Sequence, residues 1–529
     1  MIKKVKAIFK NFNASQKRIL LKTSDHTIGI TTISKKWVVL ICMSFLIFLG
    51  NFDFTAVLLA IPKISSEFNA NIRTVQWILV SYIITSAAFI LTNRHFCNFI
   101  GKRKTFFLGC GIFALSSLIA ALSTDVKLLI FSRFIQGIGY ALAFPLIYSF
   151  VFDAFPPNQR GTSMGFLHFT TAVAQASGPF LGGMVIEWIG WRTIFFVNIP
   201  ICVLAGCLMY GLSSSQKKNK EKFSYPLIVN LFIGLSSLIL IMFSLNFFDS
   251  FLPKVFCFLL SIALFIIFLL LEKKSDHPLS TWSIFNNIEF TKISVIRFLI
   301  QIVFTEFFLL PGLFLQNDLL KSPAETGSLY LIMTLVFAFT ALVGGKSVDK
   351  IGAKAPLTLG LIFLILSSSL FCFFFHSPSH ILLFSGFFTG GLGLGLTFPA
   401  SLYIAMHSAS EEDRPTASSF FLMIALIGCS VGASVSSFYL NFSAKVSLKN
   451  FILGMNNLSP RHLSALHNLL SGANAIRPEN LRFLDPAQLK VLTTYAAQPF
   501  FILMAFNAIF MLIGLMLAMQ LKTPGAVQK

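Results

Sequence analysis

The most restrictive feature of this chain is a series of long apolar segments, because about 20 apolar residues in a helix match the hydrocarbon core of a bilayer. Fourteen such segments can be marked, at residues 37–62, 75–93, 105–123, 128–152, 162–188, 192–212, 225–246, 252–271, 293–315, 327–346, 355–376, 379–407, 415–440 and 499–521. The chain is 55% hydrophobic and only 12% charged, which is too apolar for a soluble protein. The first segment is also too long for a signal peptide. The sequence therefore predicts an all-α polytopic membrane protein.

The placement of the basic residues predicts the orientation of these segments. With the N-terminus inside, the inward segments carry 27 of the 41 Lys and Arg residues and the outward segments 12, six of them in the loop 441–498. This is the positive-inside bias. The net charge of +21 is therefore assigned to membrane topology and to anionic lipid near the basic tail, and not to nucleic acid. We expect a multi-pass membrane protein with both termini cytoplasmic.

The sequence lacks the motifs of disulfide-stabilised proteins, metalloproteins and ATP-driven proteins. None of the 8 cysteines lies in an expected outward loop, so no disulfide framework is implied. No Cys/His cluster has metal-ligand spacing, and no Walker A sequence is present. We therefore predict no metal, no cofactor, no use of ATP and no enzymatic activity.

Two short segments of the chain resemble each other. They are residues 94–104, after the second apolar segment, and residues 345–354, after the tenth. Both resemble motif A of the major facilitator superfamily of transporters, G-x-x-x-D-x-x-G-[RK]. The second copy supplies Asp349 and Gly352, and the first supplies Gly101 and Arg103 but has Asn98 where the motif has Asp. The resemblance implies two six-helix bundles plus two inserted helices, 14 in all.

The domain boundaries follow from this repeat. We expect a basic cytoplasmic tail at 1–36, an N-terminal six-helix bundle at 37–212, linkers and two inserted helices at 213–277, a C-terminal six-helix bundle at 278–521, a long periplasmic loop at 441–498 within it, and a cytoplasmic tail at 522–529.

Further motifs of the same superfamily occur in the expected order. Residues 133–141 fit R-x-x-Q-G-x-G-x-A, which resembles motif B, and residues 178–183 resemble motif C, the antiporter motif. Residues 191–200 fit W-R-x-x-F-x-x-N-x-P, and residues 53–62 are close to D-x-T-[IV]-V-N-V-A-L-P. Both patterns are typical of the fourteen-helix EmrB/QacA drug:proton antiporters. Departures from the family patterns are Arg94 and Asn98 in the first motif A, Leu58 in place of Asn, and Ala174 in place of the leading Gly of motif C.

Two charged residues lie deep in the expected spans of the first half. Counting 1.5 Å per residue, Asp53 lies about 24 Å from the inner face and Arg133 about 8 Å from the outer face, so both lie in the outer half of the bilayer. An ion pair between them is possible. A nearby cation favours the carboxylate whereas a dry site favours the neutral acid, and a group balanced between the two suits proton exchange. The alternative is a structural pair that does not titrate.

Two charged residues occupy one expected span of the second half. Glu306 is a candidate for a second proton site or an anchor for a cationic substrate, or it satisfies Gln301 or a helix end. Arg297 lies near the inner end of the same span, and we expect it to extend to the membrane surface in a structural role.

Two sets of residues complete the predicted site. The substrate-cavity candidates are Tyr82, Gln136, His168, Gln175 and Gln301. The residues expected to act in conformational change are Asn98, Gly101, Arg103, Gly137, Gly178, Pro179, Gly182, Gly183, Asp349 and Gly352. Motif C combines small residues, which allow close helix approach, with a proline, which permits a bend.

The resemblance implies a proton-coupled secondary transporter that exports amphipathic drugs or toxic compounds by alternating access. One alternative is a dedicated exporter or importer of a metabolite, siderophore or lipid, and another is a non-transporting membrane receptor. Partners would be a small-molecule substrate, protons and the lipid bilayer. The family often works with a periplasmic adaptor protein, for which the loop 441–498 is either a docking surface or a solvated connector.

Overall fold

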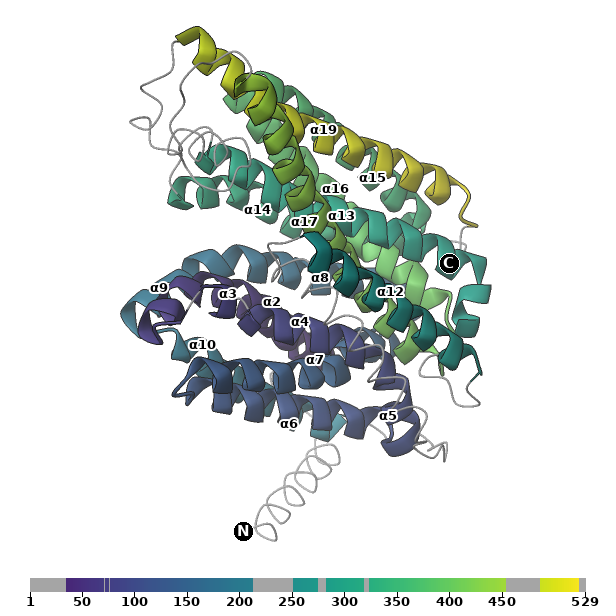
Figure 1. Cartoon of the computed structure of the whole chain (residues 1–529). Helices are drawn as coiled ribbons and strands as arrows, with labels where there is room; N and C mark the ends of the chain where they lie inside the picture. Colours follow the sequence, from purple (N-terminus) through teal and green to yellow (C-terminus); the bar gives the residue numbers. More distant parts are fainter. Residues whose placement is uncertain are drawn as a thin grey trace, which may run out of the picture.

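A computed structural model describes residues 35–70, 72–75, 77–212, 251–274, 282–317, 323–452 and 486–522, and these residues contain helices but no strand (Figure 1). The principal helices are α2 (Lys35–Glu67), α3 (Ile72–Val75), α4 (Trp77–Phe89), α5 (Asn93–Ile100), α6 (Lys102–Ala121), α7 (Val126–Ala154), α8 (Arg160–Ser177), α9 (Gly183–Trp188), α10 (Arg192–Leu212), α12 (Phe251–Lys274), α13 (Ile288–Asn317), α14 (Pro323–Ile351), α15 (Lys354–His376), α16 (His380–His407), α17 (Arg414–Ile452) and α19 (Pro486–Met519). Eleven helices among the described residues are long and apolar enough to cross a membrane.

The helices form two halves. In the first half, α2 packs against α8 and α10, and α7 packs against α4 and α6. In the second half, α16 packs between α14 and α15, and α13 packs against α17. The two halves lie side by side in Figure 1, and they meet where α8 contacts α14 and α16 and where α7 contacts α17. The chain thus folds as two helical bundles with a seam between them.

The repeated motif has the same backbone geometry in both halves. Gly101, between α5 and α6, has φ +91°, and Gly352, between α14 and α15, has φ +83°. Residues with a Cβ rarely adopt this conformation, which explains glycine at the equivalent place in both copies. Both copies are largely helical, because residues 94–100 lie in α5 and residues 345–351 lie at the end of α14.

The fifth expected span is divided. Residues 160–188 form α8, a five-residue π-helical segment (Gly178–Gly182) and α9, and not one regular helix. Pro179 has no backbone N–H to donate to the helix ladder, and glycines are the first and last residues of the segment, so the local change in winding coincides with motif C.

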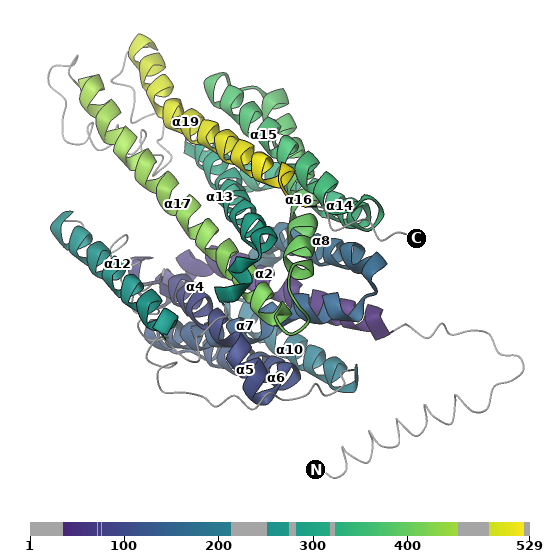
Figure 2. The same cartoon turned by 90° about the vertical axis from the view of Figure 1, so that its right-hand side faces the viewer.

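The expected inserted helices and the long loop are only partly described. The inserted segment 252–271 corresponds to α12, which lies at the periphery of the molecule (Figure 2). The other, 225–246, lies outside the described residues, as do both tails except Lys35, Lys36 and Lys522. The count of fourteen spans therefore stays a prediction.

The segment predicted as the loop 441–498 is helical at both ends. The apolar, membrane-length parts of the flanking helices are Arg414–Leu440 and Ala497–Met519, and the periplasmic loop between them stays a prediction. Helix α17 continues to Ile452 and α19 begins at Pro486, which leaves 453–485 outside the described residues. Between residues 433 and 453 the sequence has neither Gly nor Pro to end the helix, and proline is well tolerated in the first helical turn.

Candidate functional site

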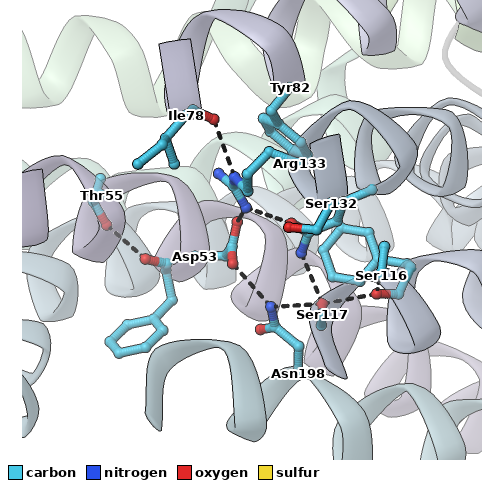
Figure 3. A network of polar contacts seen from close by, with 12 residues as sticks. Asp53, Thr55, Ile78, Tyr82, Ser116, Ser117, Ser132, Arg133 and Asn198 are labelled. Carbon is cyan, nitrogen blue, oxygen red and sulfur yellow. Dashed lines mark hydrogen bonds and ion pairs between the residues drawn. The ribbon is translucent and has the colours of Figure 1, made fainter. Parts of the chain in front are cut away.

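A buried ion pair joins α2 to α7. The Arg133 guanidinium donates from Nη1 to Asp53 Oδ2 at 2.7 Å, and neither side chain has exposed surface. Arg133 also donates from Nε to the carbonyl oxygen of Ile78 on α4 at 3.3 Å and from Nη1 to Gln136 Oε1 at 2.5 Å. Figure 3 shows the guanidinium pointing at the carboxylate from the facing helix. The two residues meet as their depths in the sequence suggested, whereas their role in proton coupling stays a prediction.

Helices α6 and α10 complete the network around this pair. Asn198 donates from Nδ2 to Asp53 Oδ1 at 2.8 Å and to Ser117 Oγ at 3.2 Å, and Gln136 donates to the same Ser117 Oγ at 2.9 Å (Figure 3). Both carboxylate oxygens of Asp53 therefore accept hydrogen bonds. Ser117 and Asn198 are absent from the predicted site. Asn198 stands in the W-R-x-x-F-x-x-N-x-P pattern, which could have indicated it, but nothing in the sequence around Ser117 does.

Aromatic rings close the remaining sides of the guanidinium. The Arg133 Cζ lies 4.4 Å from the ring centroid of Tyr82 and 5.5 Å from that of Phe195. The Tyr82 ring packs in turn on Tyr140, with centroids 5.6 Å apart. A cation over an aromatic face is attracted by the negative charge of the ring face. Tyr82 and Gln136, predicted for the substrate cavity, thus lie around the ion pair.

Motif B glycine brings α7 close to α4. A Cβ on Gly137 would lie 2.7 Å from the carbonyl oxygen of Tyr82 and 2.9 Å from the Cβ of Thr85. Real side chains do not approach so closely, so only glycine permits this spacing. The close approach places the base of Arg133 against α4, from which Ile78 and Tyr82 contact it.

The second motif A joins the two halves. Asp349, near the C-terminus of α14, accepts hydrogen bonds from the backbone N–H of Gly161 (2.7 Å), the backbone N–H of Thr162 (2.7 Å) and the Thr162 hydroxyl (2.5 Å). These donors form the N-terminus of α8, where free N–H groups and the helix dipole favour a negative charge. We call this end of the molecule, formed by α5, the start of α6 and the α14–α15 turn, the basic end.

At the same end, the first half presents a different charge arrangement. Asp153 at the end of α7 accepts from Lys102 Nζ at 2.6 Å and from Arg414 Nη1, at the start of α17, at 2.6 Å. Arg94 on α5 lies 3.8 Å from Asp413. Asn98 lies on α5, and Arg103 lies at the start of α6 with its Cζ 5.5 Å from the Phe107 ring.

Asp153 and Arg414 were not predicted as functional residues, and they sit outside the motif A copies. The shorter of the two ion pairs that join the halves on this side is therefore Asp153–Arg414, at 2.6 Å, beside Arg94–Asp413 at 3.8 Å. The carboxylate comes from the end of α7 and not from the motif position held by Asn98.

Glycines set the closest approaches of α8 and motif C. A Cβ on Gly161 would lie 2.5 Å from the carbonyl oxygen of Gly345 on α14. In motif C, a Cβ on Gly178 would collide with the Thr55 hydroxyl and one on Gly182 would lie 2.9 Å from the Cβ of Ala56, so both glycines pack on α2. Added atoms at Gly183 would meet nothing within 4 Å. Motif C therefore packs inside the first half, while Gly161 packs across the seam.

The Trp-Arg pair that opens the W-R-x-x-F-x-x-N-x-P pattern holds the end of α2. Trp191 donates from Nε1 to Glu67 Oε2 at 2.6 Å, and Arg192 donates to the other carboxylate oxygen. The hydrogen bond from Arg192, followed by that from Trp191, lowers the pKa of Glu67 below its ordinary value. The pattern thus anchors α10 to α2 at one end and supplies Asn198 to the ion pair further along.

Glu306 lies inside the second half. It is 3% exposed, accepts from the Ser436 hydroxyl of α17 at 2.7 Å, and lies beside Asn507 of α19. These partners belong to the second half, so the carboxylate is held within that half. The arrangement favours a proton-handling or structural role over an anchor for a cationic substrate.

The other predicted cavity residues are spread along the seam and its flanks. Gln175 of α8 donates to Asn51 Oδ1 of α2 at 3.5 Å, and Gln301 of α13 donates to the Cys429 thiol of α17 at 2.9 Å. His168 of α8 lies with its ring edge toward Phe398 of the second half, at a centroid distance of 5.4 Å.

The expectation for Arg297 is wrong. Its side chain is only 6% exposed and its Cζ lies 4.1 Å from the Phe398 ring. The guanidinium is thus enclosed between the rings of Phe398 and Phe421 and does not extend to the surface.

The fold and the site define a class. Two halves of membrane-spanning helices, an intramembrane ion pair, and polar contacts that join the halves at one end are features of a multi-pass transport protein. The sequence matches the Major Facilitator Superfamily over residues 43–287 and 293–453, and the chain belongs to this family.

Individual relatives agree with this assignment. The chain is 27% identical to the riboflavin transporter RibZ of Clostridioides difficile (strain 630) over 338 residues, which is 63% of this chain and 73% of that protein. It is 24% identical to the multidrug transporter protein MdtP of Bacillus subtilis (strain 168), over 85% of this chain and 83% of that protein. Among solved structures, the proton:xylose symporter XylE matches with a TM-score of 0.58 and 12% identity over 91% of this chain and 96% of that one, which supports the fold alone.

Proposed function

We propose that this protein is a proton-coupled exporter of amphipathic drugs or toxic compounds in a bacterial inner membrane, with the basic end and both termini in the cytoplasm. The observation that carries the proposal is the fully buried Asp53–Arg133 pair. An ionised pair in a low-dielectric interior is stable only while both charges are present. Protonation of Asp53 removes the partner of Arg133 and therefore changes the energy of the whole network that joins α2, α4, α6, α7 and α10.

Alternating access requires that one end of the seam open while the other closes. At the basic end in this conformation the halves are joined by the hydrogen bonds from α8 to Asp349 of α14 and by the ion pairs Asp153–Arg414 and Arg94–Asp413. Opening that end breaks these links, and the proton on Asp53 supplies the bias between the two conformations. Glu306, enclosed with Ser436 and Asn507, is the second candidate for a protonated group.

The drug substrate is supported by relatives named as exporters. MdtP is named a multidrug transporter, and a Streptomyces glaucescens protein that is 26% identical to this chain over 341 residues is named a tetracenomycin C resistance and export protein. The similarity to RibZ favours a second candidate, a transporter of one metabolite of flavin type. The family resemblance also supports a periplasmic adaptor protein as a proposed partner.

Transport by purified protein tests the proposal. In proteoliposomes, an imposed proton gradient should drive accumulation of a lipophilic dye, and a protonophore should abolish it. Competition by unlabelled drugs but not by riboflavin supports the exporter, and the reverse result supports the metabolite transporter. Dye accumulation that ignores the proton gradient would contradict both.

A further inference from the structure

Arg297 is a buried cation to which the described part of the protein supplies no counter-charge. It lies on α13 with 6% exposure, and its Nε and Nη1 atoms have no hydrogen-bond partner. Its Cζ is 4.1 Å from the Phe398 ring and 4.8 Å from the Phe421 ring. Within the described residues no ion pair includes it. Arg133, at comparable burial, has the carboxylate of Asp53 at 2.7 Å.

This contrast matters energetically. A guanidinium held away from water without an anion is strongly unfavourable, and the two aromatic faces compensate only part of that cost. A charge retained under these conditions points to an anion other than the carboxylates of the described residues.

A second polar group without partners lies next to Arg297 on the other half. His168 of α8 is 2% exposed, and both of its ring nitrogens lack hydrogen-bond partners. Its ring also meets Phe398, and it lies close enough to Arg297 to interact with it electrostatically. At least one nitrogen of an imidazole carries a hydrogen. The two side chains therefore offer several unused N–H donors from opposite sides of the seam.

Aromatic side chains surround these donors. Tyr148 of α7 packs on the His168 ring with centroids 6.4 Å apart and also lies near Arg297. Phe304 and Phe337 pack against Phe398 at 5.7 Å and 5.2 Å. A few convergent polar groups within an apolar wall are the usual composition of a small-molecule site.

We propose that Arg297 and His168 bind the anionic group of the transported substrate, and that the substrate is an amphipathic anion, such as an aromatic carboxylate. The inference rests on the proposed transport function and names the class of substrate that the protein transports. The guanidinium fork pairs with the two oxygens of a carboxylate, and His168 donates to one of them from the other half. A substrate held this way contacts both halves at once, so its binding is coupled to the relative position of the two halves. A cationic compound would instead be repelled by Arg297.

Three probes of one shape test the charge preference. They are 2-naphthoate, 2-naphthamide and 2-naphthylmethylammonium, whose binding to the purified protein in nanodiscs is measured by calorimetry. Wild type should bind the carboxylate about 10- to 100-fold more tightly than the amide, as expected for a charge-assisted hydrogen-bonded pair, and should bind the ammonium most weakly.

The variants Arg297→Gln and Arg297→Lys separate recognition from structure. Arg297→Gln should lose the preference for the carboxylate while its affinity for the amide stays the same. Its thermal stability should be unchanged or higher, because an unpaired buried charge has been removed. Arg297→Lys should keep part of the preference, since the charge remains but the fork does not. His168→Phe should reduce carboxylate affinity several-fold without affecting the amide.

Several results would overturn the proposal. Equal affinity of wild type for the three probes, no measurable binding of the carboxylate, or a carboxylate preference that survives in Arg297→Gln would each do so. A loss of thermal stability in both Arg297 variants with the preference intact would assign Arg297 a structural role. Calorimetry needs no proton gradient, so the two proposals can fail separately. Carboxylate binding without gradient-driven flux would contradict only the proposed function. Gradient-driven flux without a preference for the carboxylate would contradict only this inference.

Discussion

Replacing Asp349 with Asn is expected to open the basic end of the protein. In the closed arrangement the Asp349 carboxylate accepts three hydrogen bonds from the N-terminus of α8, at 2.7, 2.7 and 2.5 Å. An Asn side chain has one acceptor oxygen, so its NH2 group must face donors at the other position. The substitution therefore removes the charge and at least one hydrogen bond across the seam.

The size of the effect follows from these contacts. A hydrogen bond to a charged group contributes about 1.5–3 kcal/mol, and a charge at a helix N-terminus about 0.3–1 kcal/mol. Because Asp349 is only partly buried, solvent screening reduces the sum to about 2 kcal/mol. This corresponds to a shift of about 30-fold in the ratio of open to closed conformations.

Electron–electron distance measurements between spin labels at positions 104 and 350 report that ratio, since both side chains are exposed on opposite halves of the basic end. Asp349→Asn should move population to longer distances. Lys346→Gln is the matched control, because it also changes one charge on the same exposed end of α14. A distance distribution in Asp349→Asn that matches both wild type and this control would refute the reasoning.

Four further outcomes are expected. Gly161→Ala should weaken closure of the basic end and slow transport at least several-fold, because the new Cβ would lie 2.5 Å from the Gly345 oxygen, whereas Gly183→Ala, with nothing within 4 Å, should transport at the wild-type rate. Asn198→Leu should reduce gradient-driven transport about tenfold or more while the protein still reaches the membrane, since one oxygen of Asp53 loses its donor; wild-type transport would remove Asn198 from the site. Because the pKa of Glu67 is lower in the folded protein, its contribution to stability is present above the unfolded value near 4.5 and is lost as the pH falls. At pH 7 the melting temperature of the wild type should therefore exceed that of Glu67→Gln, by a small margin because the ion pair is exposed. The two melting temperatures should converge at acid pH. Glu306→Gln should reduce transport of an anionic and of a neutral compound equally, because Glu306 handles protons or supports the second half. A cation that the wild type transports and Glu306→Gln does not would restore the substrate-anchor interpretation.

The membrane class and the Asp53–Arg133 contact could be derived from the sequence because they depend on simple lengths. Apolar segments of about 20 residues select helices, and a rise of 1.5 Å per residue places Asp53 and Arg133 at similar depth. The repeat of motif A could also be found in the sequence, because the positive φ at Gly101 and at Gly352 requires glycine at the same place in both halves.

The remaining contacts depend on which helices face each other, which residue spacing does not define. In the sequence Ser117 is one serine in an apolar segment, and only the packing of α6 shows that it lies between Gln136 and Asn198. Asp153 gives no motif, and its role follows only from the approach of α17 with Arg414. Arg297 was expected at the surface because its depth was counted along one helix, whereas neighbouring helices enclose it between Phe398 and Phe421.

The most direct test of the central claim compares two modes of transport in Asp53→Asn. In proteoliposomes, substrate counterflow needs no net movement of protons, whereas accumulation driven by a proton gradient does. If Asp53 exchanges the proton, the variant should retain counterflow and lose gradient-driven accumulation, and Arg133→Lys should lose most of that accumulation as well, because a lysine lacks the fork that reaches Asp53, Gln136 and the Ile78 carbonyl. Gradient-driven accumulation at the wild-type level in Asp53→Asn would contradict the account.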